Sequence, residues 1–225
     1  GLLNVMKYAE SPTRVWIDDV KINGKTDNFS VDPHWEGHGN RREYKDCFVR
    51  PRFDFGYSLT NFAGGAAPGE LGGLVFRGDC RYSNRLACYG DRLNKLTLKR
   101  PLKASGKICL RRGITDSSTL IGFYNSLASM AVNPSQESGI PKSFLGAAIE
   151  GPSREGFYFY PSYRIFGDQQ SHGHGKNPPH LFPDGKSHNW TLVYTPEALD
   201  RNGRITVTLD AQSNSIDLPR DHKAA

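Results

Sequence analysis

The stretch HNWTLVYTPEALDRNGRITVTL, residues 188–209, decides the fold class of this chain. Residues 188–194 and 204–209 each alternate apolar with polar side chains, which is the period of a strand with one buried face. The segment between them, 196–203, offers at most one turn of helix and ends in a glycine. The pattern therefore predicts two antiparallel strands joined by a short polar connection.

The same kind of pattern recurs along the rest of the chain. In 156–160, Phe157 and Phe159 point to one face while Tyr158 and Tyr160 point to the other. Clusters of Gly, Pro, Asn and Asp separate the apolar runs, and helical periodicity is nearly absent. Further strands are expected at 14–22, 71–77, 106–112, 120–124, 143–150 and 214–218. The sequence thus predicts an all-β, antiparallel, two-sheet sandwich.

The first of these strands makes a specific prediction about side-chain direction. Strict alternation over 14–22 places Val15, Ile17 and Asp19 on one face of the strand. It places Trp16, Asp18 and Val20 on the opposite face.

The chain has 225 residues and a net charge of +6, but its Lys and Arg residues are scattered. The densest groups are the pairs 41–42 and 111–112, and neither a basic block nor a nucleic-acid-binding module is present. We therefore expect no nucleic-acid partner. No apolar run is long enough to cross a bilayer, so no membrane insertion is expected.

Four cysteines, Cys47, Cys80, Cys88 and Cys109, occur without a CxxC pair. This spacing excludes a zinc ribbon and a thioredoxin motif. Cys80 and Cys88 enclose a short turn-like segment, so a disulfide that closes this loop and a pair of free thiols both remain open. Cys109 lies in a strand pattern, at a position typical of a buried thiol.

Several stretches resemble concanavalin A-like and laminin G-like jelly-roll domains. Residues 190–194 and 205–210 resemble their late strands, and Trp16–Ile22 resembles their last strand. Asp32–Glu36 is similar to the entry of their first strand. The resemblance implies a jelly roll that is secreted or at the cell surface, with a polysaccharide or other glycan as partner. A structural Ca²⁺ is the one cofactor that it implies, and no Asp-rich loop identifies ligands for it.

The order of these stretches is unusual, because the family's closing strand stands ahead of its entry. Residues 1–24 are therefore interpreted as terminal strands of a sandwich, either a preceding repeat or this one in permuted order. Residues 25–225 are interpreted as the main sandwich. We favour a single compact sandwich that belongs to a larger multidomain protein.

The leading functional hypothesis is a non-catalytic module that binds carbohydrate or mediates interactions. Sugars stack on aromatic faces while charged or amide groups hold their hydroxyls, and Trp35, Tyr158, Tyr160 and Arg164 are the candidate ligand-binding residues. No catalytic residue is assigned. A purely structural repeat is a third interpretation.

The alternative is a glycan-active enzyme, a glycoside hydrolase or a polysaccharide lyase. A hydrolase needs two closely placed carboxylates, and Glu150 and Glu155 instead bracket a hairpin turn. A lyase would use Tyr and Arg side chains, and the lyase hypothesis places Arg111 and Arg112 on one face with Tyr158, Tyr160 and Arg164. The histidines between 172 and 188 match no zinc motif and are interpreted as loop residues, His180 among them.

Overall fold

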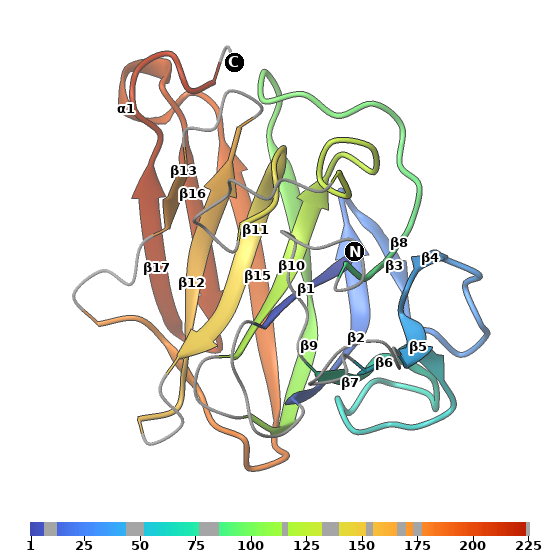
Figure 1. The fold of residues 1–225 in the computed structure, drawn as a ribbon. Coiled ribbons are helices and arrows are strands. Elements are labelled where there is room, and N and C mark those ends of the chain that lie inside the picture. The colour runs from blue at the N-terminus through green and yellow to red at the C-terminus, as the bar shows by residue number, and fades with distance from the viewer. Residues whose placement is uncertain are drawn as a thin grey trace.

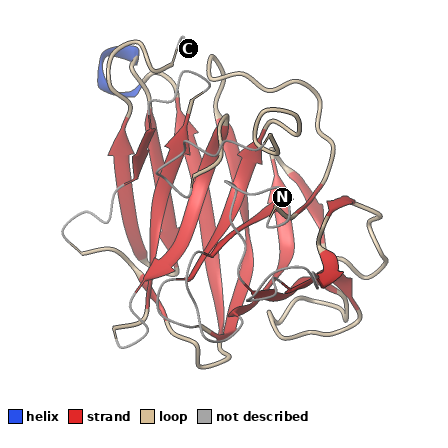
Figure 2. Cartoon of the chain, in the orientation of Figure 1, coloured by secondary structure: helices blue, strands red, loops and turns tan. Residues whose placement is uncertain are grey.

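The computed structural model describes residues 1–6, 13–43, 52–76, 86–113, 117–131, 140–151, 155–165, 170–172 and 177–223. Within these residues the chain forms two antiparallel β-sheets (Figures 1 and 2). The only helix that they contain, α1 (Ala198–Arg201), is a single turn in the connection where the sequence allowed no more than one. The prediction of an all-β antiparallel sandwich is confirmed.

One sheet, called sheet A here, has eight strands in the described part of the chain. Their order across the sheet is β13 (Gln170–His172), β12 (Phe157–Arg164), β11 (Phe144–Gly151), β10 (Ser117–Tyr124), β1 (Leu2–Met6), β8 (Cys88–Gly90) and β4 (Glu36–His38). The short strand β14 (His180–Leu181) pairs with the first part of β12.

The second sheet, sheet B, has nine strands within the same residues. Their order is β17 (Gln212–Asp217), β16 (Arg204–Leu209), β15 (Ser187–Thr195), β9 (Leu102–Arg112), β2 (Thr13–Ile22), β7 (Glu70–Phe76), β6 (Arg52–Ser58) and β5 (Arg41–Glu43). A ninth strand, β3 (Lys25–Asp27), folds back on β2. The two strands of the opening stretch are β15 and β16, with Trp190 opposite Leu209.

The N-terminal strands lie inside both sheets. β1 is placed between β10 and β8 in sheet A, and β2 is placed between β9 and β7 in sheet B. Strands β1 and β2 therefore belong to the same sandwich as the strands that follow, and the backbone groups of β9 and β7 are hydrogen-bonded to β2.

The predicted alternation of β2 is wrong after Asp18. The register of β2 against β9 shifts between Asp18 and Lys21, and Asp19 has a φ of 48°. This β-bulge inserts a residue and reverses the side-chain phase. As a result Val20 points into the core beside Ile17, instead of to the opposite face.

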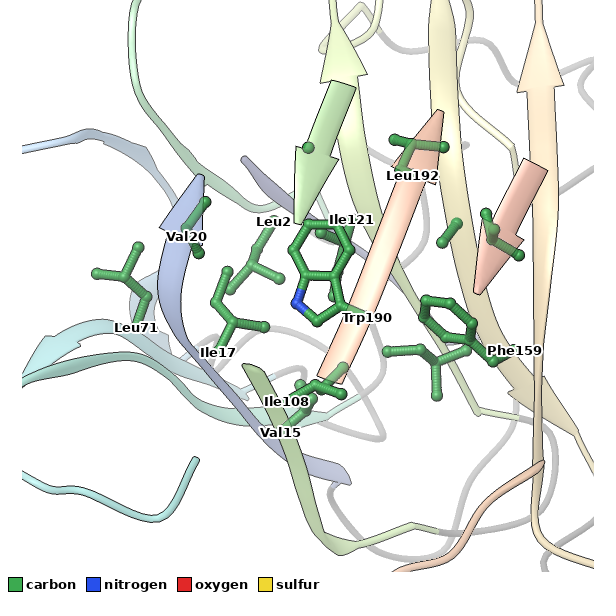
Figure 3. Packing of buried hydrophobic residues seen from close by; sticks show 14 of the residues in the cluster. Leu2, Val15, Ile17, Val20, Leu71, Ile108, Ile121, Phe159, Trp190 and Leu192 are labelled. Atoms are coloured by element: carbon green, nitrogen blue, oxygen red, sulfur yellow. The ribbon is translucent and has the colours of Figure 1, made fainter. Parts of the chain in front are cut away.

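The core lies between the inner faces of the two sheets (Figure 3). Trp190 is its largest fully buried side chain, and its indole donates to the Lys107 carbonyl at 3.3 Å. Ile17, Ile121 and Phe159 surround it from three other strands. Burial of this apolar surface is the main force that holds the sheets together.

The described cysteines are thiols. Cys88 and Cys109 are both buried and free, so of the two possibilities for Cys88 the structure has the thiol. The buried strand thiol predicted at Cys109 is confirmed. Cys47 and Cys80 lie outside the described residues. Where the chain is described, no helix has the length and apolarity needed to cross a bilayer.

Candidate functional site

The structure places three of the four predicted ligand-binding residues on one face of one strand. Tyr158, Tyr160 and Arg164 project from the outer side of β12, because they are separated by even numbers of residues. Phe157 and Phe159 project from its inner side into the main core.

Tyr160 and Arg164 are nearly inaccessible on this face. The Tyr160 hydroxyl donates to the Glu150 carboxylate, and burial together with that carboxylate raises the pKa of Tyr160 far above its usual value. Arg164 is 5% exposed and donates from Nη1 to the Ile140 carbonyl at 3.0 Å. Both side chains therefore stabilise the outer layer of sheet A and do not present a polar end to solvent.

This outer layer is a second, smaller apolar cluster. Tyr160 packs there against apolar side chains from three neighbouring strands and from one loop position. They are Leu120 of β10, Phe144 and Ala148 of β11, Cys88 of β8, and Ile140 just before β11. Sheet A is therefore partly buried on both faces, which explains why Leu120 of β10 and Phe144 and Ala148 of β11 are apolar although they point away from the main core.

Tyr158 belongs instead to an aromatic strip at the edge of sheet A. Its ring centroid lies 5.0 Å from that of His180 in β14, and His180 lies 6.3 Å from Phe182. Phe182 is 47% exposed. The Tyr158 hydroxyl donates to Glu155 at 2.8 Å, and this hydrogen bond raises the pKa of Tyr158. We call Tyr158, His180 and Phe182 the aromatic strip.

A glycine makes room for this strip. Gly156 has a φ of 87°, and a Cβ added to it would lie 3.1 Å from the Phe182 ring and 3.3 Å from Cβ of His180. Phe182 was not predicted as a site residue, and His180 was predicted to lie in a loop. In the structure His180 lies in β14, opposite Tyr158. The alternation of His180, Leu181 and Phe182 was the available signal, with Leu181 pointing into the core.

The one-face arrangement expected for a lyase is wrong. Arg111 and Arg112 lie on β9 in sheet B, whereas Tyr158, Tyr160 and Arg164 lie on sheet A. The Arg111 guanidinium is 3.9 Å from the centroid of the Phe62 ring and 5.9 Å from that of Trp16, on the outer face of sheet B.

Two buried carboxylates lie on that outer face of sheet B. Glu70 is fully buried and accepts hydrogen bonds from the Thr60 hydroxyl and from the amides of Phe62 and Ala63, at 2.5, 2.9 and 2.7 Å. These bonds fix the Gly-rich loop that crosses the sheet. Glu70 is thus a structural anchor whose oxygens are already occupied.

Asp18 is the second buried carboxylate and is less well satisfied. Its Oδ1 accepts the Asp19 amide at 2.7 Å, while its Oδ2 has no partner at hydrogen-bonding geometry among the described residues. Burial raises the pKa of Asp18 to about 6, and the nearby backbone amides of Asp19 and Gly65 offset this only in part. A charge is therefore held here at a cost in stability.

These carboxylates do not fit the calcium ion that the sequence resemblance implies. Calcium takes six to eight oxygen ligands, whereas the described residues hold no group of three or more His, Cys, Asp or Glu side chains arranged for a metal. A side-chain cation already lies near Asp18. The Lys107 ammonium is 3.5 Å from Asp19 Oδ2 and donates to the Gly64 carbonyl at 2.5 Å.

A cleft of about 960 Å³ opens at one end of the sandwich. The ends of both sheets, the loop between β8 and β9 and the turn after β10 enclose it; in Figure 1 that loop arches in green over the upper end. Trp35 lines one wall, held edge-on to Phe29 at 5.5 Å and tilted against Tyr89 at 5.7 Å. Arg164 lines another wall, so this cleft brings Trp35 and Arg164 together and leaves out the aromatic strip.

No protein-family model matches this sequence, and no curated protein and no solved structure shows significant similarity to the chain. The two candidate binding surfaces among the described residues are therefore the aromatic strip and the cleft.

Proposed function

We propose that this chain is a non-catalytic binding module and that it binds a carbohydrate chain at the aromatic strip. The observation that carries this proposal is an exposed Phe182 ring, continuous with His180 and Tyr158 and bordered by the Glu155 carboxylate. Aromatic rings offer apolar faces to the C–H side of a pyranose, and a carboxylate accepts hydrogen bonds from its hydroxyls.

The chemistry of the tyrosines favours binding over catalysis. A lyase base must lose its proton near neutral pH, so its pKa should be lowered. The pKa of Tyr158 and that of Tyr160 are both raised, and each hydroxyl already donates to a carboxylate. The guanidinium of Arg111, which would neutralise a uronate, lies on the other sheet. The enzymatic alternative is accordingly the weaker one.

As in other surface-exposed sandwich modules, we propose that the domain acts outside the cytoplasm as one part of a larger protein. The strip lies at a sheet edge and ends in an exposed ring, so it suits a long chain that passes along the surface better than a single enclosed sugar. In this proposal specificity comes from Glu155 and from the polar ends of Tyr158 and His180.

A glycan-array screen of the whole chain, with and without added calcium, tests the proposal. Hits should bind wild type and lose binding in Phe182→Ala. Leu59→Ala, which removes an even more exposed apolar side chain on the loop before β7, should bind as wild type does. Product analysis on each hit should show the glycan intact. Binding that survives Phe182→Ala, unsaturated or newly reducing products, or no hit at all would each overturn it.

A further inference from the structure

The end cleft has an apolar interior that the aromatic strip does not share. Its inner wall is continuous with the main core and consists of aliphatic and aromatic side chains from both sheets, including Ile17, Val20, Ile121, Phe123, Leu145 and Trp190. Figure 3 labels four of these, Ile17, Val20, Ile121 and Trp190, within the core. At about 960 Å³ it lies at the upper end of the range of about 300–1,000 Å³ that is typical of small-molecule sites.

Such an interior gives little to a sugar hydroxyl, because aliphatic walls neither donate nor accept hydrogen bonds. Apolar cavities of protein interiors take up apolar molecules instead of water. The interior of this cleft therefore fits an alkyl chain better than it fits a glycan.

The mouth of the cleft has the opposite character. Four accessible basic side chains and two carboxylates line the cleft, namely Arg92, Lys95, Lys99, Lys223, Glu36 and Asp91, whereas Arg164 is buried in its wall. Arg92 is paired with Glu36 at 2.7 Å, and the Lys223 ammonium donates to the carbonyls of Pro196 and Arg201.

Lys95 and Lys99 differ from those two basic residues. They stand exposed on the loop between β8 and β9, and neither makes an ion pair with a described residue. The Tyr194 hydroxyl donates to the Leu98 carbonyl at 2.9 Å. This hydrogen bond ties the loop to the core at a point between the two lysines. Two free ammonium groups are thus held at the entrance to an apolar space.

Leucines complete the rim. Leu93 and Leu96 lie on the same loop, and Leu127 lies on the turn after β10; all three are exposed and line the cleft. An exposed apolar side chain beside an apolar opening extends the surface on which an alkyl chain can lie.

We propose that the end cleft binds a single-chain anionic amphiphile of the long-chain fatty acid type. The alkyl chain lies in the cleft at the ends of the two sheets, over the apolar side chains that form its inner wall, and the carboxylate lies at Lys95 and Lys99. This site shares no residue with the aromatic strip, so the inference stands whether or not the strip binds a glycan.

The test uses the whole chain after removal of co-purified lipid, with palmitate as the probe. Trp35 and Trp190 line the cleft, so their fluorescence reports occupancy directly. Cetyl alcohol has the same chain length without the charge, and octanoate has the charge with a short chain. We expect saturable palmitate binding, weaker cetyl alcohol binding and no measurable octanoate binding.

Two matched variants separate the charges of the mouth from the net charge of the protein. Lys95→Glu with Lys99→Glu should lower palmitate affinity about tenfold and leave cetyl alcohol affinity unchanged. Lys21→Glu with Lys25→Glu makes the same charge change on β2 and β3, outside the cleft, and should leave both affinities as in wild type. Ile22→Trp, which narrows the mouth, should weaken both ligands.

Three results would overturn the proposal. One is a wild-type chain that does not bind palmitate. A second is an equal loss of affinity in the two double variants, which would mean that only net charge matters. The third is binding to vesicles that contain anionic phospholipid without any binding of monomeric palmitate, since this would make the leucine rim a membrane-docking surface.

Discussion

Replacing the buried Asp18 with asparagine should stabilise the protein near neutral pH. Asp18 is fully buried, and its Oδ2 lacks a hydrogen-bond partner among the described residues. The Lys107 ammonium is drawn to Asp19 at 3.5 Å, so it does not form an ion pair with Asp18. Asparagine keeps the oxygen that accepts the Asp19 amide and removes the charge.

The magnitude follows from the pKa of Asp18, which is about 6 in the folded protein against an ordinary value of 3.8 for an aspartate in water. Because the folded state binds the proton more tightly, the ionised group lowers stability above pH 6. That penalty disappears as the pH falls toward 4. A difference of about two pKa units corresponds to about 3 kcal/mol. The new amide NH₂ of the Asp18→Asn protein will face the backbone N–H of Gly65, and this contact between two donors offsets part of the gain. We therefore expect Asp18→Asn to raise the free energy of unfolding by about 1–3 kcal/mol.

Urea unfolding at pH 8, 6 and 4 measures this directly, provided that the slope with denaturant is unchanged. Asp18→Asn should be more stable than wild type at pH 8, by less at pH 6 and hardly at all at pH 4. Asp54→Asn, at an exposed ion pair with Arg41, is the control and should change stability by less than about 1 kcal/mol at any pH. An Asp18→Asn protein that is clearly less stable at pH 8 would refute the reasoning, since it would mean that the charge is compensated in the folded state.

Two other substitutions test the internal carboxylates by the same unfolding assay. Glu70→Gln replaces one carboxylate oxygen by an NH₂ group, which then faces the donors of Thr60 and Phe62 or that of Ala63. It should lower the free energy of unfolding by about 2–3 kcal/mol. A loss below about 0.5 kcal/mol would show that these hydrogen bonds do not anchor the loop. Tyr160→Phe removes the hydroxyl that donates to Glu150 and should cost about 1–3 kcal/mol while leaving glycan binding intact. A Tyr160→Phe protein that is fully stable but binds no glycan would instead make Tyr160 a ligand-binding residue.

Strands β15 and β16 were predictable because they bury side chains with a period of two, and their hairpin follows directly from this local pattern. The hairpin of β11 and β12 was marked instead by two apolar runs on either side of a segment that begins with Gly and Pro. The bulge at Asp19 was not predictable in this way, because a single inserted residue leaves the composition of the strand unchanged and reverses only its phase.

The candidate sites depend on contacts between residues that are distant in the sequence. Tyr158 was identified from its strand, but its neighbour His180 joins it only through the pairing of β12 with β14. Likewise, alternation cannot tell which sheet a strand enters, so Arg111 was grouped with Tyr158 although it lies on sheet B. Tyr160 is buried because a second apolar layer covers the outer face of sheet A. Alternation within one strand does not predict that layer.

The most direct test of the binding-module account is calorimetric titration of the best array hit into wild type and Phe182→Ala, followed by analysis of the recovered glycan. The account predicts that Phe182→Ala is as stable as wild type and that its affinity for the glycan is lower by about tenfold or more. It also predicts that the glycan recovered from wild type is intact. Equal affinity for the two proteins, or a glycan cleaved by wild type, would contradict it.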